Sequence, residues 1–158
     1  VEEFIEMEWL RAARETTAMS LVLLAVDSFR DFEETFGEQA VDGLMMKLAD
    51  ALASTLRRPM DFLGRYGSDG FAVVLPVTGY HGASYLGEKM RWLVEVQAIS
   101  AGDESDDIVT VSVGTATAAP QPGSTPQTFV DAARNALETA MFQGGNTVKS
   151  TELFPNEL

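Results

Sequence analysis

Hydrophobic positions recur along this chain with two different spacings, which predict strands and helices. Residues Leu21–Val26 form a near-continuous apolar run, which is typical of a central strand buried on both faces. A later segment has helical spacing, and its apolar stripe consists of Val41, Leu44, Met45, Leu48, Leu52 and Leu56. Two short apolar segments at 62–66 and 71–75 are separated by turn-forming residues, which predicts a β-hairpin.

The same reading extends over the whole chain. It predicts helices at residues 2–15, 29–36, 38–56, 79–96 and 125–142, and strands at 20–27, 62–66, 71–75, 108–116 and 146–149. This order predicts an α/β (α+β) sandwich, with a central, mostly antiparallel five-stranded sheet and helices packed on it. We expect one domain over residues 1–158, made of an N-terminal helix (1–18), a core (19–150) and a C-terminal tail (151–158). Trp9, Trp92 and the Met45-Met46 pair are expected to pack inside it.

Composition and charge narrow the functional classes. The chain has 158 residues, 46% of them hydrophobic, which is enough for one packed core. No apolar run approaches the roughly 20 residues of a membrane span, and without cysteine there is no disulfide or thiolate metal site. A net charge of −13 repels nucleic-acid phosphates. We therefore expect a cytoplasmic domain without nucleic-acid binding or membrane contact.

Three regions together carry a resemblance to a known family. They are the segment 25–42 (AVDSFRDFEETFGEQAVD), the turn 65–71 (RYGSDGF), and the pair 109–114 and 132–137 (VTVSVG and AARNAL). In this order and spacing they resemble the GGDEF family, named for its G-G-(D/E)-E-F hairpin turn, over nearly the whole chain. The resemblance implies a nucleotidyl-cyclase-like GGDEF fold. It also implies a diguanylate cyclase ancestry, in which two facing domains join two GTP molecules into cyclic di-GMP.

The metal site that this resemblance implies is incomplete. The hairpin remnant consists of Gly67, Ser68, Asp69, Gly70 and Phe71. The family takes one Mg²⁺ carboxylate from the first strand and another from the turn, and the first of these positions is Ala25 here. Asp69 keeps the turn position, Gly70 replaces the usual Glu, and Asp27 is the one nearby acid that could substitute. We therefore predict no intact catalytic set, and only Asp69 and Asp27 as weak metal-ligand candidates.

The positions that the family uses for GTP are also altered. An Asn that recognises guanine is replaced by Glu33, whereas the accompanying Asp is retained as Asp42. An ionised Glu only accepts hydrogen bonds, so it cannot replace the donor of an Asn. The two cations that hold phosphate correspond to Met141 and Gly145, and Arg30 keeps a third basic position. Arg30 and Asp42 are therefore remnants of a substrate site.

A second site of the family is retained. Its inhibitory R-x-x-D motif matches Arg58-Pro-Met-Asp61, and a basic residue on the following helix corresponds to Lys89, with Arg91 nearby. The resemblance implies that the Arg contacts guanine and phosphate of cyclic di-GMP and that the Asp accepts from the guanine edge. Lysine at position 89 keeps the charge but not the bidentate fork of an arginine.

These residues leave three interpretations open. The first is a catalytically degenerate GGDEF domain of the cyclic di-GMP system, which acts as a cyclic di-GMP receptor or as a regulatory partner of other signalling domains. The second is a protein-interaction module that binds no nucleotide. The third is a weakly active diguanylate cyclase in which Asp27 replaces the missing carboxylate. No cofactor is expected, and Mg²⁺ would bind only if GTP binding persists.

Overall fold

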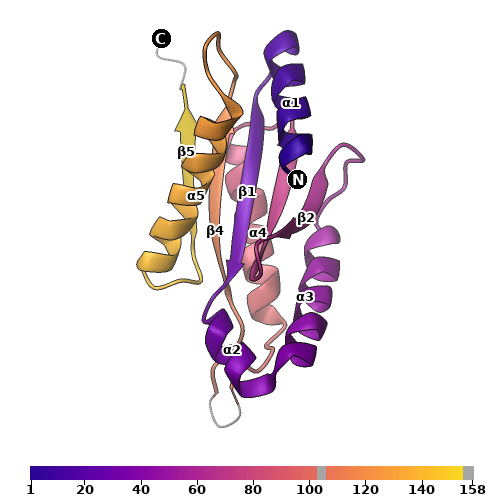
Figure 1. The fold of residues 1–158 in the computed structure, drawn as a ribbon, viewed down its shortest axis with the longest axis vertical. Coiled ribbons are helices and arrows are strands. Elements are labelled where there is room, and N and C mark those ends of the chain that lie inside the picture. The colour runs from indigo at the N-terminus through magenta and orange to yellow at the C-terminus, as the bar shows by residue number, and fades with distance from the viewer. Residues whose placement is uncertain (103–105, 155–158) are drawn as a thin grey trace.

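The computed structural model describes residues 1–102 and 106–154, and within them the chain folds into one five-stranded sheet with helices on both faces (Figure 1). The elements are α1 (Glu2–Glu15), β1 (Met19–Val26), α2 (Phe29–Phe36), α3 (Glu38–Ala53), β2 (Phe62–Tyr66), β3 (Gly70–Pro76), α4 (Tyr80–Val96), β4 (Val111–Ala118), α5 (Pro126–Phe142) and β5 (Val148–Leu153). The strand order is β2-β3-β1-β4-β5. Only the β4–β5 pairing within this described part is parallel, so the predicted fold class is confirmed.

Strand β1 lies at the centre of the sheet. It pairs antiparallel with β3 on one side and with β4 on the other, and all eight of its residues are buried. Its side chains alternate between two hydrophobic clusters. Val22, Leu24 and Val26 face the cluster that α2, α3 and α4 cover, whereas Met19, Leu21 and Leu23 face the cluster that α1 and α5 cover. Both faces are therefore apolar, as the continuous run of the sequence predicts.

Several boundaries differ from the sequence prediction. Helix α3 ends at Ala53 rather than at residue 56, although Leu56 still packs against the core. Strand β4 begins at Val111 rather than at residue 108. Strand β5 runs from Val148 to Leu153, so part of the predicted tail belongs to the sheet, and residues 155–158 of that tail lie outside the described residues. The polar β5 is an edge strand, and its backbone pairing with β4 leaves little hydrophobic signal in the sequence.

Two predicted core residues are on the surface. Trp9 and Met45 are buried as expected, but Trp92 is 53% exposed on α4 and Met46 is exposed on α3. Met46 directly follows the buried Met45, and Trp92 lies two residues after the buried Met90. Both side chains therefore lie on the solvent side of their helices. In the described residues, no helix is long and apolar enough to cross a membrane.

Helix α5 packs on β4 at Gly114, where the two backbones approach closely. A Cβ at this position would overlap the backbone nitrogen of Leu137 and lie 2.6 Å from the carbonyl oxygen of Ala133. Neither backbone atom can move without displacing the helix. Glycine at this position therefore sets the distance between α5 and the sheet.

We expect Gly114→Ala to lower the free energy of unfolding by about 3 kcal/mol, because the added methyl group overpacks a contact between two backbones. Urea denaturation followed by circular dichroism would measure it. Gly43→Ala in α3 is the matched control, since no atom lies within 4 Å of the added Cβ. That control should gain roughly 0.5–1 kcal/mol from helix propensity, and equal effects of the two changes would contradict the close-packing argument.

Candidate functional site

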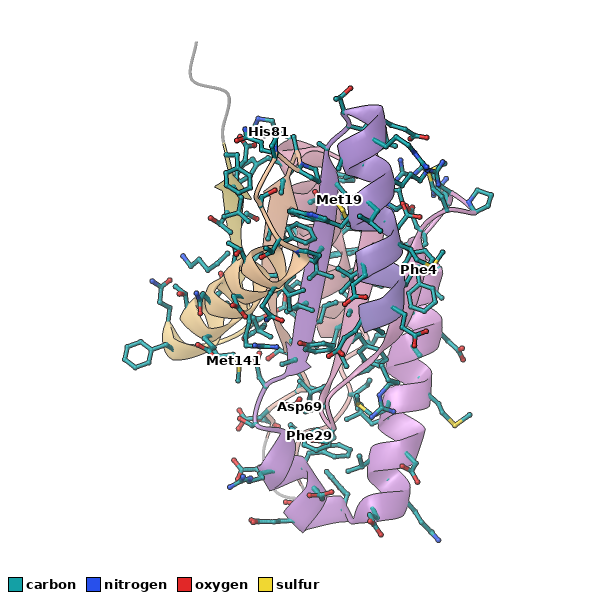
Figure 2. All side chains as sticks on the ribbon, turned by 45° about the horizontal axis from the view of Figure 1, so that its top comes forward. Phe4, Met19, Phe29, Asp69, His81 and Met141 are labelled. Atoms are coloured by element: carbon teal, nitrogen blue, oxygen red, sulfur yellow. The ribbon has the colours of Figure 1, made fainter. Side chains whose placement is uncertain are left out.

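The end of β1 lies beside the turn of the β2–β3 hairpin. Ala25 pairs with Gly70, and the backbone N–H of Val26 donates to the carbonyl oxygen of Asp69 at 2.9 Å. Figure 2 shows Asp69 near Phe29, at the end of β1 opposite to Met19. The strand position and the turn position that the resemblance assigned to metal binding, Ala25 and Asp69, are thus adjacent in space, but Ala25 brings no side-chain ligand to the site.

The hairpin turn packs tightly against β1. A Cβ at Gly70 would overlap the carbonyl oxygen of Leu24, and it would lie 3.2 Å from that of Tyr66. The Arg65 guanidinium donates to the carbonyl oxygen of Ser68 and lies 5.7 Å from the Phe71 ring centroid. The turn therefore has no space for a glutamate side chain at position 70 unless its backbone moves. Asp69 is half-buried at the tip.

The carboxylate of Asp27 is held by three hydrogen bonds. Its carboxylate accepts from the Thr110 hydroxyl at 2.7 Å, the Ser112 hydroxyl at 2.6 Å and the backbone N–H of Asn146 at 2.8 Å. It lies just beyond the last residue of β1 and ties this strand to β4 and to the α5–β5 connection. A Cβ at Gly145 would lie within 3.0 Å of the same carboxylate. A carboxylate with this many donors has a structural role that the sequence did not reveal.

A polar network continues from Asn146 to α4. The Asn146 side chain donates to Glu95 at 2.6 Å and accepts from Arg91 at 2.8 Å, and Arg91 also pairs with Glu88. The pKa of Glu95 lies below its ordinary value, first because Asn146 donates to it and second because Arg91 does. The ionised Glu95 therefore stabilises the fold at neutral pH, and this stabilisation is lost as the pH falls through the lowered pKa of Glu95. The network holds Arg91 on the side of α4 that faces Asn146.

A cavity of about 610 Å³ lies at this end of the sheet and is strongly acidic. Its described lining has no Lys or Arg, and its acidic members are Asp27, Asp31, Glu95, Asp106 and Asp107. Arg30 and Asp42 are exposed on α2 and α3 and do not line it, and Glu33 is also exposed. Met141, at a position that the resemblance assigned to a phosphate-binding cation, is exposed near the end of α5 (Figure 2).

A second cavity, of about 460 Å³, lies between the end of α3, the β3–α4 connection and α4. We call it the cationic pocket, and its described lining consists of Thr55, Leu56, Arg57, Arg58, Asp61, Leu75, Thr78, Gly82, Tyr85, Leu86 and Lys89. Three basic residues and one acidic residue give it a formal charge of +2 in a chain of net charge −13. The structure thus gathers Arg58, Asp61 and Lys89 around one pocket.

Arg58 is oriented by its neighbours in the cationic pocket. Its guanidinium donates to both carboxylate oxygens of Asp61, at 2.6 and 3.2 Å. It also donates to the carbonyl oxygen of Pro76 and to the Thr78 hydroxyl, both at 2.7 Å. The Asp61 side chain is 6% exposed whereas that of Arg58 is 39% exposed. A buried carboxylate therefore fixes an arginine whose outer face remains accessible to a ligand.

Comparisons with known proteins show the family of this chain. Residues 1–147 match the model of the family described as diguanylate cyclase, GGDEF domain. The chain belongs to the GGDEF domain family. It is 28% identical over 142 residues to the diguanylate cyclase DosC of Escherichia coli, which covers 90% of this chain and 30% of that protein. This GGDEF domain thus spans about a third of the length of that curated relative.

Solved structures share the fold of this GGDEF domain. The GGDEF domain of DgcB from Caulobacter crescentus, solved in complex with c-di-GMP, superposes with a TM-score of 0.84 at 24% identity, covering 94% of this chain and 86% of that one. The diguanylate cyclase SiaD from Pseudomonas aeruginosa, solved with its activator SiaC, gives a TM-score of 0.82 at 30% identity. The match covers 94% of this chain and 55% of that of SiaD.

Sequence reasoning missed three residues of the cationic pocket in this GGDEF domain. Arg57 and Tyr85 both line it, and Thr78 accepts from Arg58. The spacing of Tyr85 and Lys89, four residues apart on a helix, was a usable signal, because side chains at i and i+4 lie on one face. Arg91, which the sequence placed near this site, faces the Asn146 network instead.

We expect Asp27→Ala to destabilise this GGDEF domain by about 3 kcal/mol, since three donors lose a charged acceptor in a half-buried position. Urea denaturation would measure the loss. Asp31→Ala is the matched control, because Asp31 lines the same acidic cavity and is exposed. This substitution should change the free energy of unfolding by at most about 0.5 kcal/mol. If Asp27→Ala leaves the free energy of unfolding unchanged, the carboxylate does not fasten β1 to β4.

Proposed function

We propose that this GGDEF domain is catalytically degenerate and acts in cyclic di-GMP signalling as a receptor or regulatory partner domain. The observation that carries the proposal is the contrast between its two cavities. The cavity at the catalytic end has five carboxylates and no cation in its described lining, whereas the cationic pocket has a formal charge of +2. An anionic nucleotide is repelled by the first cavity and attracted by the second.

The chemistry of the metal site supports the loss of cyclase activity. Mg²⁺ in phosphoryl-transfer sites is held by one or two carboxylates together with the substrate phosphates. Here Ala25 and Gly70 offer none, and Asp27 is occupied by three hydrogen-bond donors. Asp69 is the remaining carboxylate at the turn. The second carboxylate is missing at the strand position, where Ala25 is buried, and a Cβ at position 70 would overlap the backbone of β1.

The phosphate side of the catalytic end supports the same conclusion. Met141 and Gly145 occupy the positions where the family has cations, and Gly145 lies against the Asp27 carboxylate. Arg30 is the one basic residue left at the phosphate-binding positions of the GTP site, and it is exposed outside the acidic cavity. Three phosphates carrying up to four negative charges would meet this acidic surface without compensating cations. Binding of GTP at this end is therefore unfavourable.

The cationic pocket supports the receptor role. Arg57 and Lys89 have no ion pair within the described residues, whereas Arg58 is paired with Asp61. The resulting charge of +2 is equal in magnitude and opposite in sign to that of the two phosphodiesters of one cyclic di-GMP. Leu56, Leu75 and Leu86 add apolar lining on which a base can pack. The outer face of Arg58 remains accessible for guanine or phosphate.

Isothermal titration with cyclic di-GMP tests the receptor role. We expect micromolar binding to the wild-type domain and a loss of at least tenfold in Arg58→Ala, because bidentate pairs to phosphate or guanine are worth about 1–3 kcal/mol. Since Arg58 also holds the β3–α4 connection, Lys89→Ala is the second variant, because it removes pocket charge without breaking a described hydrogen bond. Arg11→Ala on α1 is the charge-matched control and should bind as the wild type does.

Incubation with GTP and Mg²⁺ tests the loss of catalysis. We expect no cyclic di-GMP above the background of a protein-free sample, because the site keeps only one metal carboxylate, Asp69, and lacks two of the phosphate cations. Liquid chromatography of the nucleotides would measure it. Turnover that disappears in Asp69→Asn would establish a weak cyclase and contradict the proposed degeneracy.

A protein-interaction role without nucleotide is the second candidate. It is favoured by the apolar tip of α5, where Phe142 is 94% exposed and Met141 is also exposed. Large exposed apolar side chains are common at sites of protein association. If wild-type domain gives no heat and no thermal shift with cyclic di-GMP or GTP, the receptor role is excluded and this candidate takes its place.

A further inference from the structure

Tyr85 is a large aromatic side chain that the fold leaves without a partner. Tyr85 is 71% exposed on α4. Within the described residues its hydroxyl has no hydrogen bond and its ring has no aromatic partner, whereas Tyr80, one turn earlier on α4, packs edge-on against His81 at 5.4 Å. Tyr85 therefore contributes little to the fold, and its ring is free to contact a ligand.

The position of Tyr85 relates it to the cationic pocket. Of the described residues that line this pocket, Tyr85 alone is aromatic. It precedes Lys89 by four residues on α4, so both side chains lie on the same face of the helix. Arg58 and Asp61 come from the opposite wall, between α3 and β2. An aromatic ring, a free ammonium group and an oriented Arg–Asp pair thus surround one cavity of about 460 Å³.

This combination fits a ligand that has both a flat base and a phosphate. An aromatic ring at the rim of a basic groove attracts bases through their π-faces, whichever base is present. Phosphate alone would interact with Arg57, Arg58 and Lys89 and would gain nothing from the ring. Trp92 is also exposed on α4, but it lies outside the lining of the pocket.

We propose that Tyr85 is the base-stacking residue of the cationic pocket and that it makes the pocket prefer a purine nucleotide over a bare phosphate anion. This inference rests on the proposed receptor function and assigns it a specificity-determining side chain. One base of the dinucleotide stacks on the Tyr85 ring. Lys89 and Arg57 neutralise the phosphodiesters, and Arg58 and Asp61 contact the edge of the base from the other wall.

Isothermal titration of the full chain with cyclic di-GMP tests the assignment. We expect Tyr85→Ala to weaken binding by about tenfold or more, which is the range for the loss of one base–aromatic stack. Tyr85→Phe should retain wild-type affinity, and Tyr85→Leu should lose as much as Tyr85→Ala because it keeps apolar area without the ring. Trp92→Ala is the matched control, an exposed aromatic on the same helix, and should bind as the wild type does.

Competition with inorganic pyrophosphate provides the second readout. Pyrophosphate should bind more weakly than cyclic di-GMP. It should bind the wild type and Tyr85→Ala equally, because it has no base to stack. If the wild type binds cyclic di-GMP through Arg58 but Tyr85→Ala or Tyr85→Leu binds equally well, the stacking role is wrong and the receptor function stands. Equal losses in Tyr85→Ala and Trp92→Ala also overturn the assignment. If the wild type does not bind, both the inference and the receptor function fail.

Discussion

The pairing of β1 with strands on both of its sides is the constraint on which the rest of the domain depends. Because β1 is hydrogen-bonded to β3 and to β4 and is buried on both faces, its register fixes the ends of both neighbours. Ala25 opposite Gly70 sets the end beside the hairpin turn, and Met19 opposite Pro76 sets the other end. A slip of one residue would exchange the side chains that face the two hydrophobic clusters.

This register also separates the two cavities. The hairpin turn precedes Gly70, whereas Arg58 contacts the backbone at Pro76, and these residues are the two ends of β3. Seven residues of extended strand span about 20 Å. The acidic cavity and the cationic pocket can therefore have opposite electrostatic character in one small domain. Arg58 makes its contacts at the end of β3 that lies opposite to the hairpin turn.

The structure gives different roles to two acidic residues, Asp27 and Asp61. Asp27 could be taken for a replacement metal ligand when only its distance from Ala25 along the chain is considered. In the fold it lies beyond the end of β1 and accepts from β4 and from the α5–β5 connection. Asp61, by contrast, pairs with Arg58, which lies three residues earlier in the chain. The difference is that Asp61 has its partner within the same turn, while the partners of Asp27 are more than 80 residues away.

The sequence by itself determined the order of elements, the central strand and the sheet type, because these depend on hydrophobic periodicity. It did not determine the extent of β5, the exposure of Trp92, the three donors to Asp27 or the place of Tyr85 in the cationic pocket. Those features follow from contacts between distant segments, and a polar edge strand or an aromatic residue at the rim of a cavity leaves no periodic signal. Only the tertiary structure brings α4 against the end of α3, and so decides which residues share the pocket.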